Sequence, residues 1–328
     1  MIKYLNKYFY FLIFIPLIGN FFVNIFIDNK DVMELNFYDY ISSLLIFLFL
    51  YSLGVSLKNI FPKLTIVFGI ITYLISFYIF EILGLFINKE INFNFVIVVV
   101  NMVWIIYLVY SLNNKKLLIL NFLSYGLLFS FNRYFLDNLS SNKNITGDVY
   151  DVFFPYTSNL YNNGLFSSIA GNQSWSSGYP HFTSYLDALL FKLTFNLESY
   201  LFFSSTSFLY FWLFILLFSE LNLNKINKSL ITLIFTILVL NSDWLQFLFL
   251  TSLMSERVSI FLFLGPLVCL FKQNDNKTFE FKLIYFILSF AYLTKHFFTI
   301  LVLIIFIIFI FNNFYRKSSA FLLSAFLL

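Results

Sequence analysis

Two carboxylates three positions apart, Asp148 and Asp151, lie in the segment GDVYDVFFPY of a chain that is mostly apolar. Only 11% of the residues are charged and 60% are hydrophobic, so acids in this segment call for an explanation. A carboxylate can accept a proton from an attacking hydroxyl group, and carboxylate oxygens can hold a divalent cation. Both acids are therefore candidates for a catalytic or cation-binding role. Alternatively, Asp151 is a solvated loop acid.

Three other groups of polar residues belong beside these acids. His181 closes the segment GYPH, Glu256 and Arg257 lie in TSLMSERVS, and Lys295 lies in YLTKHFF. Lys295 suits the neutralisation of a phosphate at a membrane interface, because ionisable groups at membrane depth are costly and usually functional. Alternatively, Lys295 anchors a helix end by extending its ammonium to the interface.

The glutamate of this set has two readings as well. Glu256 or Asp151 is expected to orient the acceptor or to hold a divalent cation, if any metal binds. Alternatively, Glu256 and Arg257 form a simple loop ion pair. Two histidines and one cysteine make a His/Cys zinc site improbable.

The elements that carry these residues are membrane spans. A mean hydropathy of +0.86 and recurrent long apolar runs predict an all-α, polytopic membrane helical bundle, with the lipid bilayer as a partner and no nucleic acid. The final run, SSAFLLSAFLL, is shorter than the about 20 residues a span needs, so we expect a truncated chain. The predicted spans are 8–27, 40–57, 64–87, 94–112, 117–132, 199–219, 229–249, 258–271, 283–294 and 297–314.

The segment FTSYLDALLFKL, 182–193, has a different pattern. Its apolar residues recur at helical spacing on one side, and Thr183, Ser184, Asp187 and Lys192 lie on the other. This pattern predicts an amphipathic helix that lies in the membrane interface without spanning it.

The basic residues fix the predicted orientation, because cytoplasmic loops collect Lys and Arg. With a cytoplasmic N-terminus and no span at 182–193, most of the 20 basic residues fall on the cytoplasmic side. The segment 133–198 then faces outward, in the periplasm or an equivalent compartment. Its loop, 133–181, is far longer than a connector needs to be, which favours a functional loop over a disordered linker. Glu81 and Asp243 interrupt apolar runs, and either lines a polar cavity or bonds a neighbouring helix.

These outward features resemble the GT-C superfamily of membrane glycosyltransferases, which includes dolichyl-phosphate-mannose protein mannosyltransferase-like and aminoarabinose transferase-like enzymes. Their outer loop often reads Asp, three variable residues, Tyr-His-Leu-Pro, and then a short helix ending near Gly. Asp148 to Pro155 has this spacing, with VFFP for Tyr-His-Leu-Pro, and NLYNNGLF follows. GYPH before an amphipathic helix, Glu256 in a later outer turn, and LTKH at an outer helix end also match.

The resemblance covers about 117–300. It implies a four-span extension, 1–116, followed by a GT-C-like catalytic region, 117–328. It also implies that an inverting, hexosyltransferase-like enzyme of the inner cell membrane transfers a sugar from a polyprenyl-phosphate donor to an unknown glycan, lipid or protein acceptor. Asp148 would then be the catalytic base, with Asp151, Glu256 and His181 in support. Lys295 and Arg257 would hold the donor phosphate.

Two other classes of membrane protein fit part of the pattern. An O-antigen polymerase or ligase of another fold also has a large outer loop, but such loops usually rely on Arg and His. A transporter of lipid-linked substrates predicts internal repeats and broken helices at the membrane midplane. The sequence shows no repeat, and its polar residues gather at one face.

Overall fold

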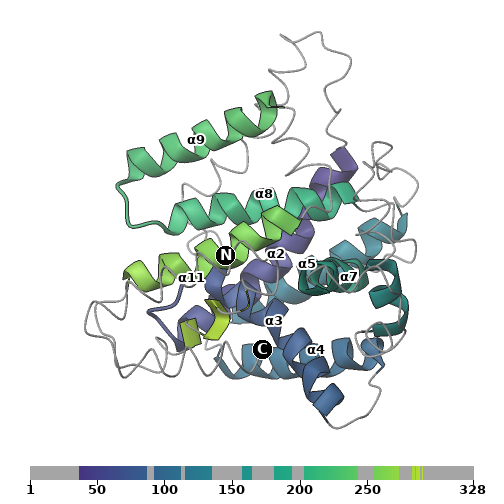
Figure 1. Ribbon diagram of the computed structural model, residues 1–328. Helices are drawn as coiled ribbons and strands as arrows, with labels where there is room; N and C mark the ends of the chain where they lie inside the picture. The colour runs from purple at the N-terminus through teal and green to yellow at the C-terminus, as the bar shows by residue number, and fades with distance from the viewer. Residues whose placement is uncertain are drawn as a thin grey trace.

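The computed structural model describes residues 37–86, 92–111, 115–134, 157–164, 181–193, 203–242, 255–272, 283–284, 286–288 and 290. Every regular element in these ranges is a helix, which confirms the all-α prediction (Figure 1). The labelled helices are α2 (Phe37–Ile60), α3 (Ile66–Phe86), α4 (Phe93–Ser111), α5 (Lys115–Tyr134), α7 (His181–Leu193), α8 (Phe203–Glu220), α9 (Lys225–Asn241) and α11 (Ser255–Lys272).

Three helices in the described part of the chain are long and apolar enough to cross a membrane. These stretches, Tyr40–Ile60, Ile66–Gly84 and Phe93–Tyr110, coincide with the spans predicted at 40–57, 64–87 and 94–112. Helices α5, α8, α9 and α11 stand where four further spans were expected. The predicted spans 8–27 and 297–314, and most of 283–294, lie outside the described residues.

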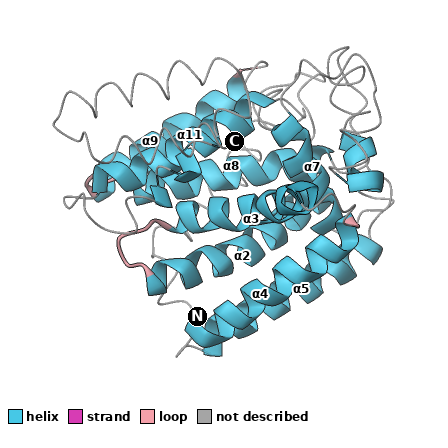
Figure 2. Ribbon diagram, turned by 60° about the horizontal axis from the view of Figure 1, so that its bottom comes forward, coloured by secondary structure: helices cyan, strands magenta, loops and turns pink. Residues whose placement is uncertain are grey.

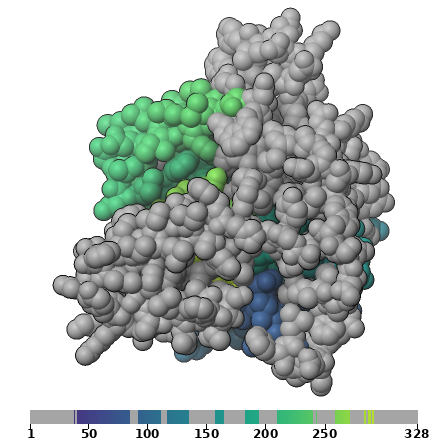
Figure 3. Space-filling model, in the orientation of Figure 1, coloured from purple at the N-terminus to yellow at the C-terminus, as the bar shows by residue number. Residues whose placement is uncertain are grey.

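Helix α2 lies at the centre of the bundle, and α4 lies at its edge. Most of the α2 span is buried, 78% of it, against 28% for α4. Helix α2 packs against α3, α4, α5 and α8, while α11 packs against α3 and α8 (Figure 2). Helix α9 packs on α8, and together they form an open face of the molecule (green in Figure 3). Five apolar side chains of α9 are exposed: Leu230, Leu233, Ile234, Ile237 and Leu238.

Small residues allow α2 and α3 to cross closely. A Cβ atom on Gly69 would lie 2.8 Å from the Cα of Gly54, and one on Gly54 would lie 2.5 Å from the carbonyl oxygen of Ile66. Both contacts are with backbone, which cannot rotate away as a side chain can. This is the small-residue packing that membrane helices use when no hydrophobic force draws them together.

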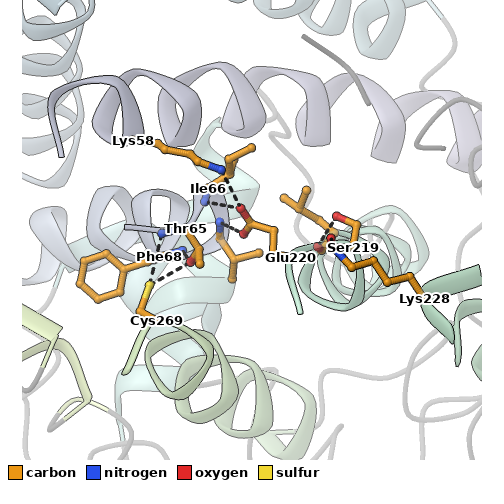
Figure 4. A network of polar contacts seen from close by, with 10 residues as sticks. Lys58, Thr65, Ile66, Phe68, Ser219, Glu220, Lys228 and Cys269 are labelled. Carbon is orange, nitrogen blue, oxygen red and sulfur yellow. Dashed lines mark hydrogen bonds and ion pairs between the residues drawn. The ribbon is translucent and has the colours of Figure 1, made fainter. Parts of the chain in front are cut away.

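Side chains from two other helices complete the start of α3. Thr65 accepts a bond from the N–H of Phe68, and Glu220 of α8 accepts from the N–H groups of Ile66 and Val67 at 2.8 and 3.0 Å (Figure 4). Lys58 lies 3.5 Å from Glu220. The first N–H groups of a helix have no partner within it, so a carboxylate here satisfies two donors and meets the positive end of the helix dipole.

These contacts define one end of the bundle, which we call the capping end: residues 58–66, Glu220 and Cys269. Cys269 of α11 lies 3.0 Å from the hydroxyl oxygen of Thr65, so α11 ends here (Figure 4). Most of the basic residues predicted to be cytoplasmic lie at the helix ends or turns of this side: Lys58, Lys63, Lys115, Lys116, Lys225, Lys228 and Lys272. A single end rich in Lys agrees with the charge bias from which the orientation was predicted.

Helix α7 forms where the amphipathic pattern predicted it, but its predicted polar face is wrong. Thr183, Ser184 and Asp187 are 0%, 2% and 1% exposed, so they do not face water. The helix contacts α3, α8 and α11, and aromatic rings surround Phe182 and Tyr185, namely those of Tyr78, Phe93 and Phe290. A 13-residue helix enclosed on several sides buries its polar residues together with its apolar ones.

Candidate functional site

The structure describes the predicted site only in part. Asp148, Asp151 and Lys295 lie outside the described residues, as does Asp243. His181 is the first residue of α7, and Glu256 and Arg257 lie in the first turn of α11, with side chains outside the described part. The grouping of these catalytic and phosphate-binding candidates therefore stays a prediction.

The helices that carry three of these residues begin at the same end of the bundle. Helix α11 starts at Ser255 and reaches the capping end at Cys269, so its start lies away from that end. Helix α7 contacts α11, and Phe182 at its start packs beside Tyr78 in the second half of α3, away from the capping end. We call the end of the bundle at which α7 and α11 begin the pocket end. His181, Glu256 and Arg257 are thus brought to one end by the backbone alone.

A short helix, 157–164, follows the acidic segment of the outer loop. The GT-C resemblance implied such a helix ending near a glycine, and this one ends at Gly164 with φ 76°. Glycine adopts this left-handed conformation without the steric cost that a side chain brings, so it commonly follows the last turn of a helix. The structure thus has a short helix at this position, and the resemblance that implied one stays a prediction.

The short helix meets α7 through a lysine and an aromatic ring. The ammonium nitrogen of Lys192 lies 4.0 Å from the centre of the Tyr161 ring. Burial lowers the pKa of Lys192 and raises the pKa of Tyr161, so the charged lysine has lost part of its hydration and the phenol stays neutral. A cation over an aromatic face recovers part of that cost. The contact joins the short helix 157–164 to α7.

An amide pocket of about 320 Å³ opens beside this contact. We define it by its described lining residues: Asn92, Phe93, Asn94, Asn162, Asn163 and Lys192. Asn92 caps α4 by accepting a bond from the N–H of Asn94 at 2.9 Å. The amide nitrogen of Asn163 donates to Asn159 at 2.6 Å. Each bond lies within its own element, the start of α4 or the short helix, and both elements line the pocket.

An apolar groove of about 430 Å³ adjoins the amide pocket. Asn94 and Lys192 line both, so the two spaces meet at these residues. The groove lies between α4 and α5 with α2 beneath. Its other described lining residues are Phe49, Leu53, Ile97, Val98, Asn101, Met102, Trp104, Ile105, Asn121, Phe122 and Tyr125.

The electrostatics of the two spaces favour an anion. Among the described residues that line them, Lys192 is the single charged side chain, and the other polar groups are carboxamides, the hydroxyl group of Tyr125 and the indole N–H of Trp104. Carboxamides donate hydrogen bonds without carrying charge, and a half-buried ammonium gains by meeting a negative group. The two spaces are therefore suited to a ligand that carries a phosphate and a polar headgroup.

Buried acids lie near α7 but line neither space. Glu81 of α3 is 5% exposed, toward the end of its helix as expected. Burial is the main cause that raises the pKa of Tyr185 well above its ordinary value, and the charges of Glu81 and Tyr78 add to it. The described residues contain no cluster of three or more His, Cys, Asp or Glu side chains, so the structure assigns no metal ligands.

Sequence reasoning passed over the amide pocket. Lys192 was predicted to lie on the polar side of an interfacial helix, and no role was predicted for Asn92, Asn94, Asn162 or Asn163. Two short signals mark the pocket in an apolar chain, the NFN of 92–94 and the NN of 162–163. Neither has a spacing that links it to the other, because the pairing arises only when the short helix folds back onto α4 and α7. Comparison of the chain with protein-family models, curated proteins and solved structures finds no match.

Proposed function

We propose that the protein is an inverting membrane glycosyltransferase that takes a sugar from a polyprenyl-phosphate donor. Transfer takes place at the outer face of the inner cell membrane, and the N-terminus is cytoplasmic. The acceptor is a glycan, lipid or protein that presents a hydroxyl group.

The observation that carries this proposal is the contact of the short helix 157–164 with α7. The helix follows directly on the segment from Asp148 to Pro155 and joins α7 through Tyr161 and Lys192. With the start of α4 it encloses an amide pocket at the end of an apolar bundle. A polar, cationic pocket at the end of membrane helices suits a substrate whose headgroup is anionic and whose tail is hydrocarbon.

The proposed chemistry is a single displacement at the anomeric carbon. Asp148 accepts the proton of the acceptor hydroxyl as that oxygen bonds to the anomeric carbon. The bond from this carbon to the phosphate oxygen breaks, and polyprenyl phosphate leaves with the electron pair. Lys295 and Arg257 stabilise the charge on the departing phosphate. Asp151, Glu256 and His181 support the acceptor or, for the acids, a divalent cation.

A comparison of two matched variants tests the roles of the acids. The full chain is purified in nanodiscs and given a polyprenyl-phosphate sugar labelled in the sugar, with a mixed glycan and lipid acceptor fraction. Asp148→Asn removes the base without changing its shape, and we expect at least a hundredfold loss of transfer, since a general base contributes about 10²–10⁴-fold. Asp151→Asn is expected to lose much less. Undiminished transfer by Asp148→Asn would refute the assignment of the base.

A further inference from the structure

The apolar groove lies mostly in a part of the chain that the glycosyltransferase resemblance does not cover. Its floor, Phe49 and Leu53, belongs to α2, and one wall belongs to α4. Both helices precede residue 116. Because the four-span extension supplies this lining, we infer that the extension does more than support the bundle.

The groove has the shape that a hydrocarbon chain requires. Its α4 wall extends from Asn94 to Ile105 at helical spacing, which is about 16 Å along the helix axis. Val98, Met102 and Phe122 on its walls are 51%, 60% and 54% exposed, so the groove opens on the outside of the bundle, where lipid chains lie. A chain can therefore enter sideways from the bilayer.

The polar residues within the groove are already held by the protein. The hydroxyl group of Tyr73 donates to Asn101 at 2.7 Å, and the amide of Asn121 donates to the hydroxyl oxygen of Ser52 at 2.7 Å. Phe49 stacks on Tyr125 with ring centres 4.8 Å apart. These contacts join α3 to α4 and α2 to α5, so the helices around the groove are linked by side-chain contacts.

The charge at the mouth decides between occupants. No acidic side chain is among the described residues that line the two spaces, so a phosphate there would supply the negative charge that a neutral lipid does not. The amide pocket beyond Lys192 has room for a headgroup attached to that phosphate.

We propose that the apolar groove holds the hydrocarbon chain of an anionic lipid whose phosphate binds Lys192 and whose headgroup occupies the amide pocket. The identity of that headgroup as a donor sugar rests on the proposed function; the binding of an anionic lipid does not. The four-span extension is then the element that selects and retains the lipid chain. Residues of α4 set how well the chain fits.

Direct binding tests this inference without any turnover. The full chain is placed in phosphatidylcholine nanodiscs, and a fluorescent polyprenyl phosphate is titrated against it. Lys192→Met is expected to weaken binding about tenfold, because a hydrogen bond to a charged group is lost. Lys63→Met removes an exposed lysine at the capping end and is expected to change nothing. Equal binding by both variants would overturn the role of Lys192.

A pair of tryptophan variants tests the groove. Val98→Trp fills it, whereas Val103→Trp places the same side chain on the same helix at a similarly exposed position that does not line it. Only Val98→Trp is expected to weaken binding, by about tenfold or more. Equal effects of the two, or full displacement of the lipid by equimolar inorganic phosphate, would overturn the chain site.

A cross-linking measurement on the unaltered protein covers the case in which Val98→Trp fails to fold. A polyprenyl phosphate with a diazirine in its chain is expected to label peptides of α2, α4 and α5, which line the groove. Label confined to other helices would overturn the inference. Since these readouts are of binding, a protein that binds the lipid but transfers no sugar would contradict only the proposed function.

Discussion

At the scale of single residues, Lys192 joins the parts of the candidate site. It lines both the amide pocket and the apolar groove, and it lies over the Tyr161 ring. It is the one lysine of α7, and the other residues of that helix from Phe182 to Leu193 are buried. Lys192 attracts an anion only while its amine is protonated, so we expect anion binding at this site to depend on pH.

The pH dependence of lipid binding follows from the lowered pKa of Lys192. Burial disfavours the ammonium, so the amine loses its proton at a lower pH than an ordinary lysine does. Only the protonated form attracts a phosphate. We therefore expect binding of the fluorescent polyprenyl phosphate to weaken as pH rises through this lowered pKa. Tyr161, which faces Lys192, stays neutral over the same range because burial raises its pKa.

The matched variant for this measurement is Lys192→Arg. An arginine keeps its charge to above about pH 12, so its binding profile is expected to stay flat up to pH 10. If Lys192→Arg and the unaltered protein lose binding at the same pH, the titrating group is not Lys192.

At the scale of helices, glycine contacts decide how closely α2 and α3 cross. Gly69→Ala places a methyl group against the backbone of Gly54, so the helices must move apart. We expect the free energy of unfolding to fall by about 1–3 kcal/mol, the usual cost of overpacking. Gly126→Ala on α5 meets no atom within 4 Å and serves as the control. Thermal unfolding in detergent measures both, and an equal loss in the two variants would contradict the close crossing.

The cap of α3 gives a second prediction at this scale. Glu220→Ala leaves the N–H groups of Ile66 and Val67 without their acceptor, and we expect a loss of about 3 kcal/mol in the free energy of unfolding. Lys58→Ala removes only a partner whose side chain is 40% exposed, which is worth less than about 1 kcal/mol. If the lysine variant proves as unstable as the glutamate variant, the ion pair and not the cap is what Glu220 contributes.

Most helices of the bundle were predictable, because a long apolar run can be recognised in the sequence without knowledge of its tertiary contacts. The amphipathic pattern of 182–193 likewise placed α7 correctly. The burial of Thr183, Ser184 and Asp187 was not predictable, since it depends on helices distant in sequence. The amide pocket was missed for the same reason. Asn92 and Asn94 come to line the same pocket as Asn162 and Asn163 only through tertiary packing.

At the scale of the whole molecule, the two ends of the bundle differ in chemistry. The capping end carries lysines, and the pocket end carries carboxamides and the starts of α7 and α11. The positive-inside bias predicts that the capping end lies in the cytoplasm and the pocket end outside. The GT-C resemblance, by contrast, rests on residues mostly outside the described part, so its catalytic assignment stays a prediction.

Cysteine labelling tests this orientation. Cys269 is buried, so the natural thiol gives little background. Asn163→Cys at the pocket end is expected to react with a membrane-impermeant maleimide in intact cells. Lys63→Cys at the capping end is expected to react only after the membrane is permeabilised. The opposite pattern of reactivity would invert the molecule in the membrane.

The measurement that tests the central proposal most directly is donor consumption by the unaltered protein. The full chain is reconstituted in liposomes with a polyprenyl-phosphate sugar, and both released polyprenyl phosphate and newly glycosylated acceptor are quantified. The proposal predicts that the two products form in equal amounts, with inverted configuration at the anomeric carbon. An intact donor after incubation with protein that binds it, across the range of acceptor fractions, would contradict the glycosyltransferase proposal.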